Sequence, residues 1–167
     1  AIAKTPGTQY NPFFIHWNAG LWKTHLLQAT ANQLIENDPK KVVLYLPCTK
    51  FIDHLIEAVK KNRLTWYVKQ FDNVDVLIID DIQFLAWKDK TQEVFLWIFN
   101  SMVEKNKQII LSWDRSPKEL TILEPRLRTR FTLWVMCDVK SPDFETRLAI
   151  LWSKCDQKWI QLSSQDS

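Results

Sequence analysis

Glycine is scarce in this chain of 167 residues, which contains only two glycines but nine tryptophans. At an average usage of ~7%, about a dozen glycines would be expected in a chain of this length. The deficit matters wherever a loop needs a residue that takes positive φ or lets a ligand approach the backbone closely, because glycine does both without steric cost.

Cysteine pairs, long apolar runs and a strong net charge are lacking as well. The three cysteines, Cys48, Cys137 and Cys155, are widely spaced and odd in number, which argues against a disulfide framework or a zinc site and indicates a reducing cytosol. No apolar run approaches the ~18–20 residues of a membrane helix, and residues 1–7 do not resemble a secretory signal. A net charge of +3 permits a polyanionic partner without requiring one.

Short apolar runs alternate with helical patterns along the chain. Strands are predicted over residues 13–17, 42–46, 74–79, 108–112 and 133–139. Helices are predicted over residues 23–37, 50–61, 63–71, 90–105 and about 141–155, with short helical turns over 117–131. Thr49 and Ser141 are the expected N-caps of two of these helices. The pattern predicts one α/β domain, a five-stranded parallel sheet flanked by helices in a three-layer sandwich, with ligands bound beyond the carboxyl ends of the strands.

The segment from Trp17 to Thr24 has the position and shape of a phosphate-binding loop, G-x-x-x-x-G-K-[ST], because a strand precedes it and a helix follows. Lys23 and Thr24 fit the lysine and hydroxyl positions, which serve the terminal phosphates and Mg²⁺. Trp17 and Trp22 occupy the two glycine positions, where a tryptophan is expected to strain the backbone and block the phosphates. The alternative is an ordinary loop between strand and helix with a solvated lysine.

Two carboxylates, Asp80 and Asp81, end the apolar run that begins at Val74. Asp80 is expected at the carboxyl edge of the sheet beside Thr24, where the two would hold Mg²⁺. Asp81 would then orient or activate an attacking water. The alternative is a solvated acidic turn.

Two further polar clusters follow later in the chain. Residues 112–115 form a polar cluster at the same sheet edge. Arg126, Arg128 and Arg130 are spaced by two residues; they suit either phosphate contacts or a solvated basic face.

Taken together, these segments resemble the AAA+ ATPase domain of the DnaA family of bacterial replication initiators. The resemblance covers nearly the whole chain, and its most specific parts are Lys-Thr-His-Leu-Leu at 23–27 and Asp-Asp-Ile-Gln-Phe at 80–84. It also includes residues 10–15, 74–79, 107–111, 114–119 and 145–151. The implied fold is the P-loop NTPase type, with residues 1–167 forming the α/β core and the family's helical lid and helix-turn-helix domain absent from the chain.

The resemblance implies a role for each matching residue. Lys23 and Thr24 match the Walker A pair, Asp80 the metal carboxylate, and Asp81 the neighbouring catalytic acid. Asp114 matches the sensor I position. Arg130 matches an arginine finger offered to the next subunit, and Arg126 lies in the same contact segment. The implied nucleotide-binding residues, for ATP or ADP with Mg²⁺, are Asn18, Ala19, Gly20, Leu21, Lys23, Thr24 and His25.

The resemblance also implies partners. By position, Ile56, Lys88 and Lys90 match residues that grip single-stranded DNA, although Ile56 equally suits core packing. The expected partners are single-stranded and origin DNA, further copies of the chain assembled head to tail, and the replicative helicase or its loader. The expected location is the cytoplasm, at the nucleoid.

The chain departs from the family at its tryptophans. Besides Trp17 and Trp22, family members usually carry glycine or another small or polar residue where this chain has Trp87, Trp113 and Trp134, and Trp159 falls where glycine is common. Natural degeneration, deliberate engineering and a misread sequence would each produce this pattern.

Three functions remain open on these grounds. The first is an ATP-dependent initiator core in which ATP acts as an assembly switch and hydrolysis is slow, or is impaired by Trp17 and Trp22. The second is a nucleotide-blind scaffold whose phosphate site is filled by those two indoles. The third is a related helicase loader or regulator ATPase.

Overall fold

A five-stranded parallel sheet forms the centre of the computed structural model, which describes residues 6–8, 10–16, 22–114, 123–132, 135–138 and 143–158. The strands are β1 (Phe13–His16), β2 (Val43–Pro47), β3 (Val76–Asp80), β4 (Gln108–Trp113) and β5 (Val135–Asp138). Their order in the sheet is β2-β3-β4-β1-β5, and every neighbouring pair is parallel. This confirms the fold class and the strands predicted from sequence.

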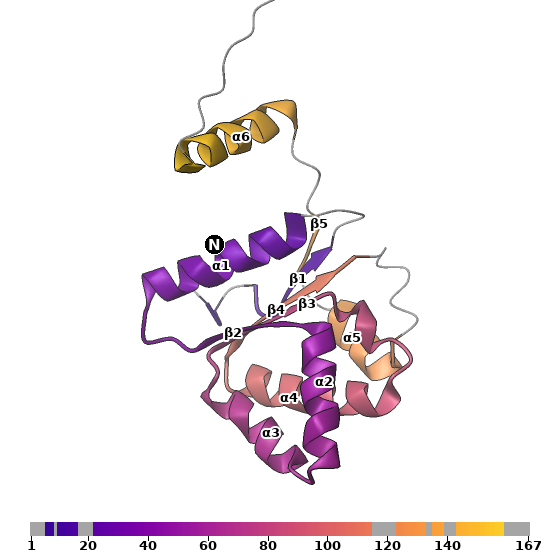
Figure 1. Ribbon diagram of the computed structural model, residues 1–167. Coiled ribbons are helices and arrows are strands. Elements are labelled where there is room, and N and C mark those ends of the chain that lie inside the picture. Colours follow the sequence, from indigo (N-terminus) through magenta and orange to yellow (C-terminus); the bar gives the residue numbers. More distant parts are fainter. Residues whose placement is uncertain are drawn as a thin grey trace, which may run out of the picture.

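Helices cover both faces of the sheet (Figure 1). They are α1 (Trp22–Asn37), α2 (Cys48–Lys60), α3 (Leu64–Gln70), α4 (Asp89–Glu104), α5 (Pro125–Thr132) and α6 (Phe144–Lys158), with the 3-10 turns η1 (Phe71–Asn73) and η2 (Ile82–Leu85). Helix α1 lies on one face and α2 to α5 lie on the other, while α6 stands apart beyond α1 (Figure 1). The three-layer arrangement is therefore as expected.

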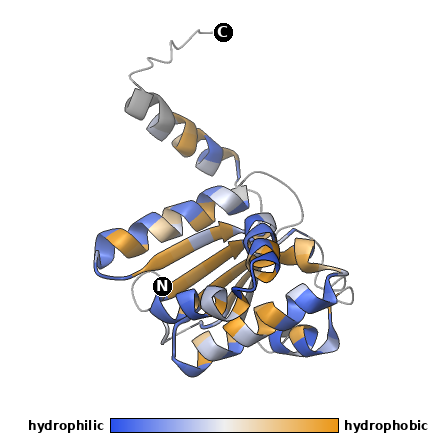
Figure 2. Cartoon of the chain, turned by 60° about the horizontal axis from the view of Figure 1, so that its bottom comes forward, coloured by the Kyte–Doolittle hydropathy of each residue, from blue (hydrophilic) through white to orange (hydrophobic). Residues whose placement is uncertain are grey.

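The buried strand β3 packs against both helical layers, because successive side chains of a strand point to opposite faces of the sheet. Val76 and Ile78 pack in the cluster beneath α1, and Leu77 and Ile79 pack in the larger cluster formed with α2 to α5. All five residues of β3 are buried. Figure 2 shows the strands as mainly hydrophobic ribbons, whereas hydrophilic and hydrophobic residues alternate along the helices.

The start of α2 differs from expectation. Helix α2 begins at Cys48, directly after Pro47, and no side-chain cap bond is made there. The prediction of Thr49 as N-cap is therefore wrong: β2 passes into the helix without a separate capping residue, so Thr49 lies inside the first turn.

The starts of α5 and α6 differ too. The short helical turns expected over 117–131 correspond to α5, which begins only at Pro125; residues 115–122 lie outside the described residues. Ser141 also lies outside them. Helix α6 begins at Phe144, and the carboxylate of Asp143 caps it by accepting a hydrogen bond of 2.8 Å from the Thr146 N–H.

None of the helices in the described part of the chain is long and apolar enough to cross a membrane.

Helix α4 offers a direct test of this packing. Phe95 is fully buried and meets Phe51 edge to face, with ring centroids 5.8 Å apart, whereas Trp97 on the same helix is 54% exposed. Phe95→Ala should lower the free energy of unfolding by about 3–5 kcal/mol, and Trp97→Ala by less than about 1 kcal/mol. Urea denaturation followed by circular dichroism measures both. Similar losses in the two variants would contradict the packing described.

Candidate nucleotide site

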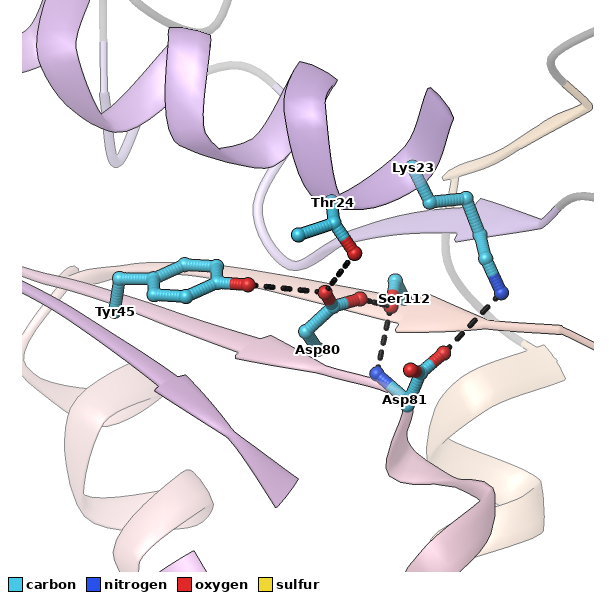
Figure 3. Close-up of polar contacts among 6 residues, drawn as sticks. All are labelled: Lys23, Thr24, Tyr45, Asp80, Asp81 and Ser112. Carbon is cyan, nitrogen blue, oxygen red and sulfur yellow. Dashed lines mark hydrogen bonds and ion pairs between the residues drawn. The ribbon is translucent and has the colours of Figure 1, made fainter. Parts of the chain in front are cut away.

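Three elements bring polar side chains to the carboxyl edge of the sheet. Lys23 and Thr24 lie in the first turn of α1, Asp80 and Asp81 end and follow β3, and Ser112 lies near the end of β4. Neighbouring parallel strands end at the same edge, so β3 and β4 present their last residues side by side. Figure 3 shows the resulting cluster, with the start of α1 lying over the tips of the strands.

Asp80 is the centre of this cluster. Its Oδ2 accepts a hydrogen bond of 2.6 Å from the Thr24 hydroxyl and another of 3.0 Å from the Tyr45 hydroxyl. Its Oδ1 accepts a hydrogen bond from the Ser112 hydroxyl (Figure 3). Because Asp80 is only 3% exposed, these three hydroxyl groups replace the water that a carboxylate would otherwise bind.

Asp81 turns away from Asp80 and pairs with the lysine. Its backbone is left-handed, with φ 60° and ψ 54°, a conformation that aspartate tolerates better than most residues. Its N–H donates a hydrogen bond of 2.7 Å to the Ser112 Oγ, and its Oδ1 lies 3.3 Å from the Lys23 Nζ. Ser112 thus connects the two aspartates, accepting from the backbone of one and donating to the side chain of the other.

The electrostatics of the cluster fit a bound cation. Lys23 pairs with Asp81, so the buried Asp80 is held by neutral hydroxyl groups alone among the contacts described for it. Burial, and then the charge of Asp80, raise the pKa of the Tyr45 hydroxyl, which keeps it protonated as a donor. A carboxylate and a hydroxyl oxygen side by side are the kind of donors that Mg²⁺ takes. The residues present therefore fit the metal expected from sequence.

The remaining expected nucleotide residues are placed less fully. Asn18, Ala19, Gly20 and Leu21 lie outside the described residues, as does Trp17, and nothing is described of the Trp22 side chain. His25 is exposed on α1, and Asp114 is exposed directly after β4. Arg126 and Arg130 are exposed on α5, where their spacing of four puts them on one face of the helix, while Leu127 and Phe131 anchor its other side in the core.

Two of the three residues expected to contact DNA share one surface. Ile56 and Lys90 line the same hollow of about 620 Å³ between α2 and α4, together with Leu55, Val59, Lys60, Leu64, Thr91, Glu93 and Val94. Ile56 is 46% exposed, so the core-packing alternative for this residue is wrong. Lys88 is exposed immediately before α4.

Two members of the site were missed in the sequence. In the sequence, Tyr45 is one residue of an apolar strand. Its phenol hydroxyl is the only feature of β2 that could have indicated a polar role. Ser112 belonged to the expected polar cluster at this edge but received no role of its own. Both became evident only from their hydrogen bonds to Asp80.

A lysine and a hydroxyl that open a helix, facing a buried aspartate at the tip of the neighbouring strand, define the core of a P-loop NTPase. Comparison with known proteins narrows this class. Residues 1–138 match the family model "Bacterial DnaA ATPAse domain". The chain belongs to this family, whose members carry the AAA+ ATPase domain of bacterial replication initiators.

Solved structures agree with this assignment. Domain III of the replication initiation protein DnaA from Thermotoga maritima is 35% identical with a TM-score of 0.90, and the match covers 98% of this chain and 68% of that one. A replication initiator DnaA bound to AMPPCP and single-stranded DNA is 34% identical with a TM-score of 0.85, over 98% of this chain and 50% of that one. This chain thus spans about half of that initiator.

A helicase loader shares the fold alone. The DnaC loader is 17% identical with a TM-score of 0.69, over 83% of this chain and 84% of that one.

The hydroxyl groups around Asp80 are open to a direct test. Ser112 is fully buried and bonds to both aspartates, so Ser112→Ala should lower the free energy of unfolding by about 1–3 kcal/mol. Tyr45→Phe removes the hydrogen bond to Asp80 from a half-buried position and should cost about 0.5–1.5 kcal/mol. Ser153→Ala, at an exposed position of α6, is the control. Urea midpoints give the three values, and equal small effects would contradict the network.

Proposed function

We propose that this domain binds ATP with Mg²⁺ at the carboxyl edge of its sheet and uses the nucleotide as a switch for assembly on DNA. The observation that carries this proposal is the 2.6 Å hydrogen bond between Thr24 and the buried Asp80. Those two oxygens would hold Mg²⁺, which neutralises charge on the phosphates when it is bound. An initiator 34% identical to this chain is bound to AMPPCP, an ATP analogue, which supports the same ligand here.

Lys23 and Asp81 would exchange partners when nucleotide enters. The Lys23 side chain is 7% exposed and held by Asp81, whose own side chain is 38% exposed. A phosphate offers Lys23 more negative charge than a single carboxylate does, so the ammonium group would move to the terminal phosphates. Asp81 would then be free to accept a proton from, or orient, a water molecule beside them. This gives slow hydrolysis a base without further rearrangement of β3.

Arg126 and Arg130 would connect the site to a neighbouring copy. Both are exposed on the same face of α5, and arginine suits phosphate through its planar, permanently charged group. Arg130 would act as the finger that reaches the nucleotide of the next subunit, with Arg126 in the same contact. ATP would thereby favour head-to-tail assembly, because the nucleotide completes the interface.

The hollow between α2 and α4 is the proposed contact for single-stranded DNA of the replication origin. Lys60 and Lys90 at the hollow and Lys88 beside it supply positive charge for phosphates, and Ile56 supplies an exposed apolar surface for sugar or base. The 34% identical initiator is bound to single-stranded DNA, which supports this class of ligand. Contacts with the replicative helicase or its loader would follow from the same role.

A nucleotide-blind scaffold is the second candidate, and the tryptophans favour it. Trp17 and Trp22 stand at the two positions where the phosphate-binding loop requires glycine. In a scaffold, the indoles would take the place of the phosphates and the domain would act through protein and DNA contacts alone.

Calorimetry separates these two functions. Mg·ATP is titrated into the chain and into a Trp17→Gly/Trp22→Gly variant. We expect the glycine variant to bind ATP in a Mg²⁺-dependent way, and Lys23→Ala in that background to weaken binding at least tenfold, since the charge that meets the phosphates is lost.

The nucleotide-binding and the scaffold functions predict different outcomes. Binding by the glycine variant but not by the original chain would identify the indoles as the block in an otherwise competent site. Absence of binding by both proteins at millimolar ATP would contradict the nucleotide site and leave the scaffold.

The DNA surface is tested by fluorescence anisotropy with labelled oligo-dT. Lys88→Ala/Lys90→Ala should weaken binding and reduce the slope of log affinity against log salt by about 1 to 1.5, because two phosphate contacts are lost on a single strand. Lys40→Ala/Lys41→Ala removes the same charge at the opposite ends of the strands and is the matched control. Equal effects of the two double variants would show that only net charge matters.

A further inference from the structure

We propose that this protein carries glycine at positions 17, 22 and 87 in its natural host. The three positions would be encoded by UGA codons, which the host reads as glycine and which appear as tryptophan in the present sequence. For positions 17 and 22 the inference rests on the proposed nucleotide site. For position 87 it rests on backbone geometry alone.

Trp87 lies in a turn that calls for glycine. The Lys88 N–H donates a hydrogen bond of 3.1 Å to the carbonyl oxygen of Leu85, which closes a four-residue turn. Ala86 has φ −51° and ψ 138°, and Trp87 has φ 61°. These values describe a type II turn, whose third residue must take positive φ and is normally glycine or asparagine. Tryptophan is thus placed where a β-carbon is strained.

Nothing about the Trp87 side chain offsets that strain through burial. The residue is 81% exposed, so its indole gains little by leaving water. The other described residues with positive φ are mostly types that accept it, namely Gly7, Asn62, Asp81 and Asn106. Tyr10 is the other bulky one, and its carbonyl oxygen accepts a hydrogen bond from the Gln108 side chain.

The same substitution recurs at the phosphate-binding loop. Positions 17 and 22 are the two glycines of the G-x-x-x-x-G-K-[ST] pattern, and both are tryptophan. Independent loss of three glycines would give a mixture of replacement residues, because codons for alanine, serine, aspartate, arginine, valine and cysteine are also one nucleotide away from glycine codons. The same replacement, tryptophan for glycine, at all three positions indicates that a single codon is the cause. The totals of two glycines and nine tryptophans fit such a shift, against about a dozen glycines expected.

The structure also supplies a comparison tryptophan. Trp97 lies in the middle of α4, a position where glycine would weaken the helix. A genuine tryptophan is therefore expected there, encoded by UGG.

The gene of the natural host and the mass of the natural protein test the inference. We expect UGA at codons 17, 22 and 87 and UGG at codon 97, and peptide masses that correspond to glycine at the first three positions. UGG at any of the three codons, UGA at all four, or peptide masses that correspond to tryptophan would overturn the inference. None of these results depends on whether ATP binds, so the proposed function fails or stands separately.

A stability measurement tests the turn itself. Trp87→Gly should raise the melting temperature by about 2–4 °C because glycine relieves the positive φ. Trp87→Ala removes the same indole but keeps the β-carbon, so it should give no comparable gain. Equal melting temperatures for the two variants would show that the turn does not demand glycine and would overturn the inference at position 87.

Discussion

The short contact between the Thr24 hydroxyl and the Asp80 carboxylate is the constraint on which the site depends. It ties the first turn of α1 to the tip of β3, and it does so because α1 begins and β3 ends at the same edge of a parallel sheet. Burying Asp80 is costly unless its oxygens are satisfied, and the hydroxyls of Thr24, Tyr45 and Ser112 satisfy them. The arrangement places the side-chain oxygens of Thr24 and Asp80 next to each other, and Lys23 lies beside Asp81.

The sequence predicted the sheet and the heart of the site well, because both depend on local patterns. Val74 to Ile79 is a continuous apolar run, which indicates a strand buried on both faces, and the Lys-Thr and Asp-Asp pairs stand at the strand ends where the topology joins them. Tyr45 and Ser112 could not be assigned in this way. Their roles depend on which hydroxyl reaches a carboxylate from a neighbouring strand, and that is a matter of register and side-chain direction. The prediction of Thr49 as N-cap was wrong because α2 begins at Cys48, directly after Pro47.

Tryptophan stands where glycine is expected both at the nucleotide site and in a separate turn. A domain that brings Lys23, Thr24, Asp80 and Asp81 together carries tryptophan at both positions where the phosphate-binding pattern has glycine. The type II turn at Trp87 shows the same conflict away from the nucleotide site, in a segment next to the proposed DNA surface. A conflict that occurs both in a sequence motif and in a separate turn is better explained by one cause in decoding than by independent substitutions.

A crystal structure of the Trp17→Gly/Trp22→Gly variant with Mg·AMPPCP tests the central claim most directly. The account predicts phosphate density beside Lys23, with the metal ion held between the Thr24 hydroxyl and the Asp80 carboxylate. A nucleotide bound elsewhere, or Thr24 and Asp80 found on separate surfaces of the domain, would contradict it.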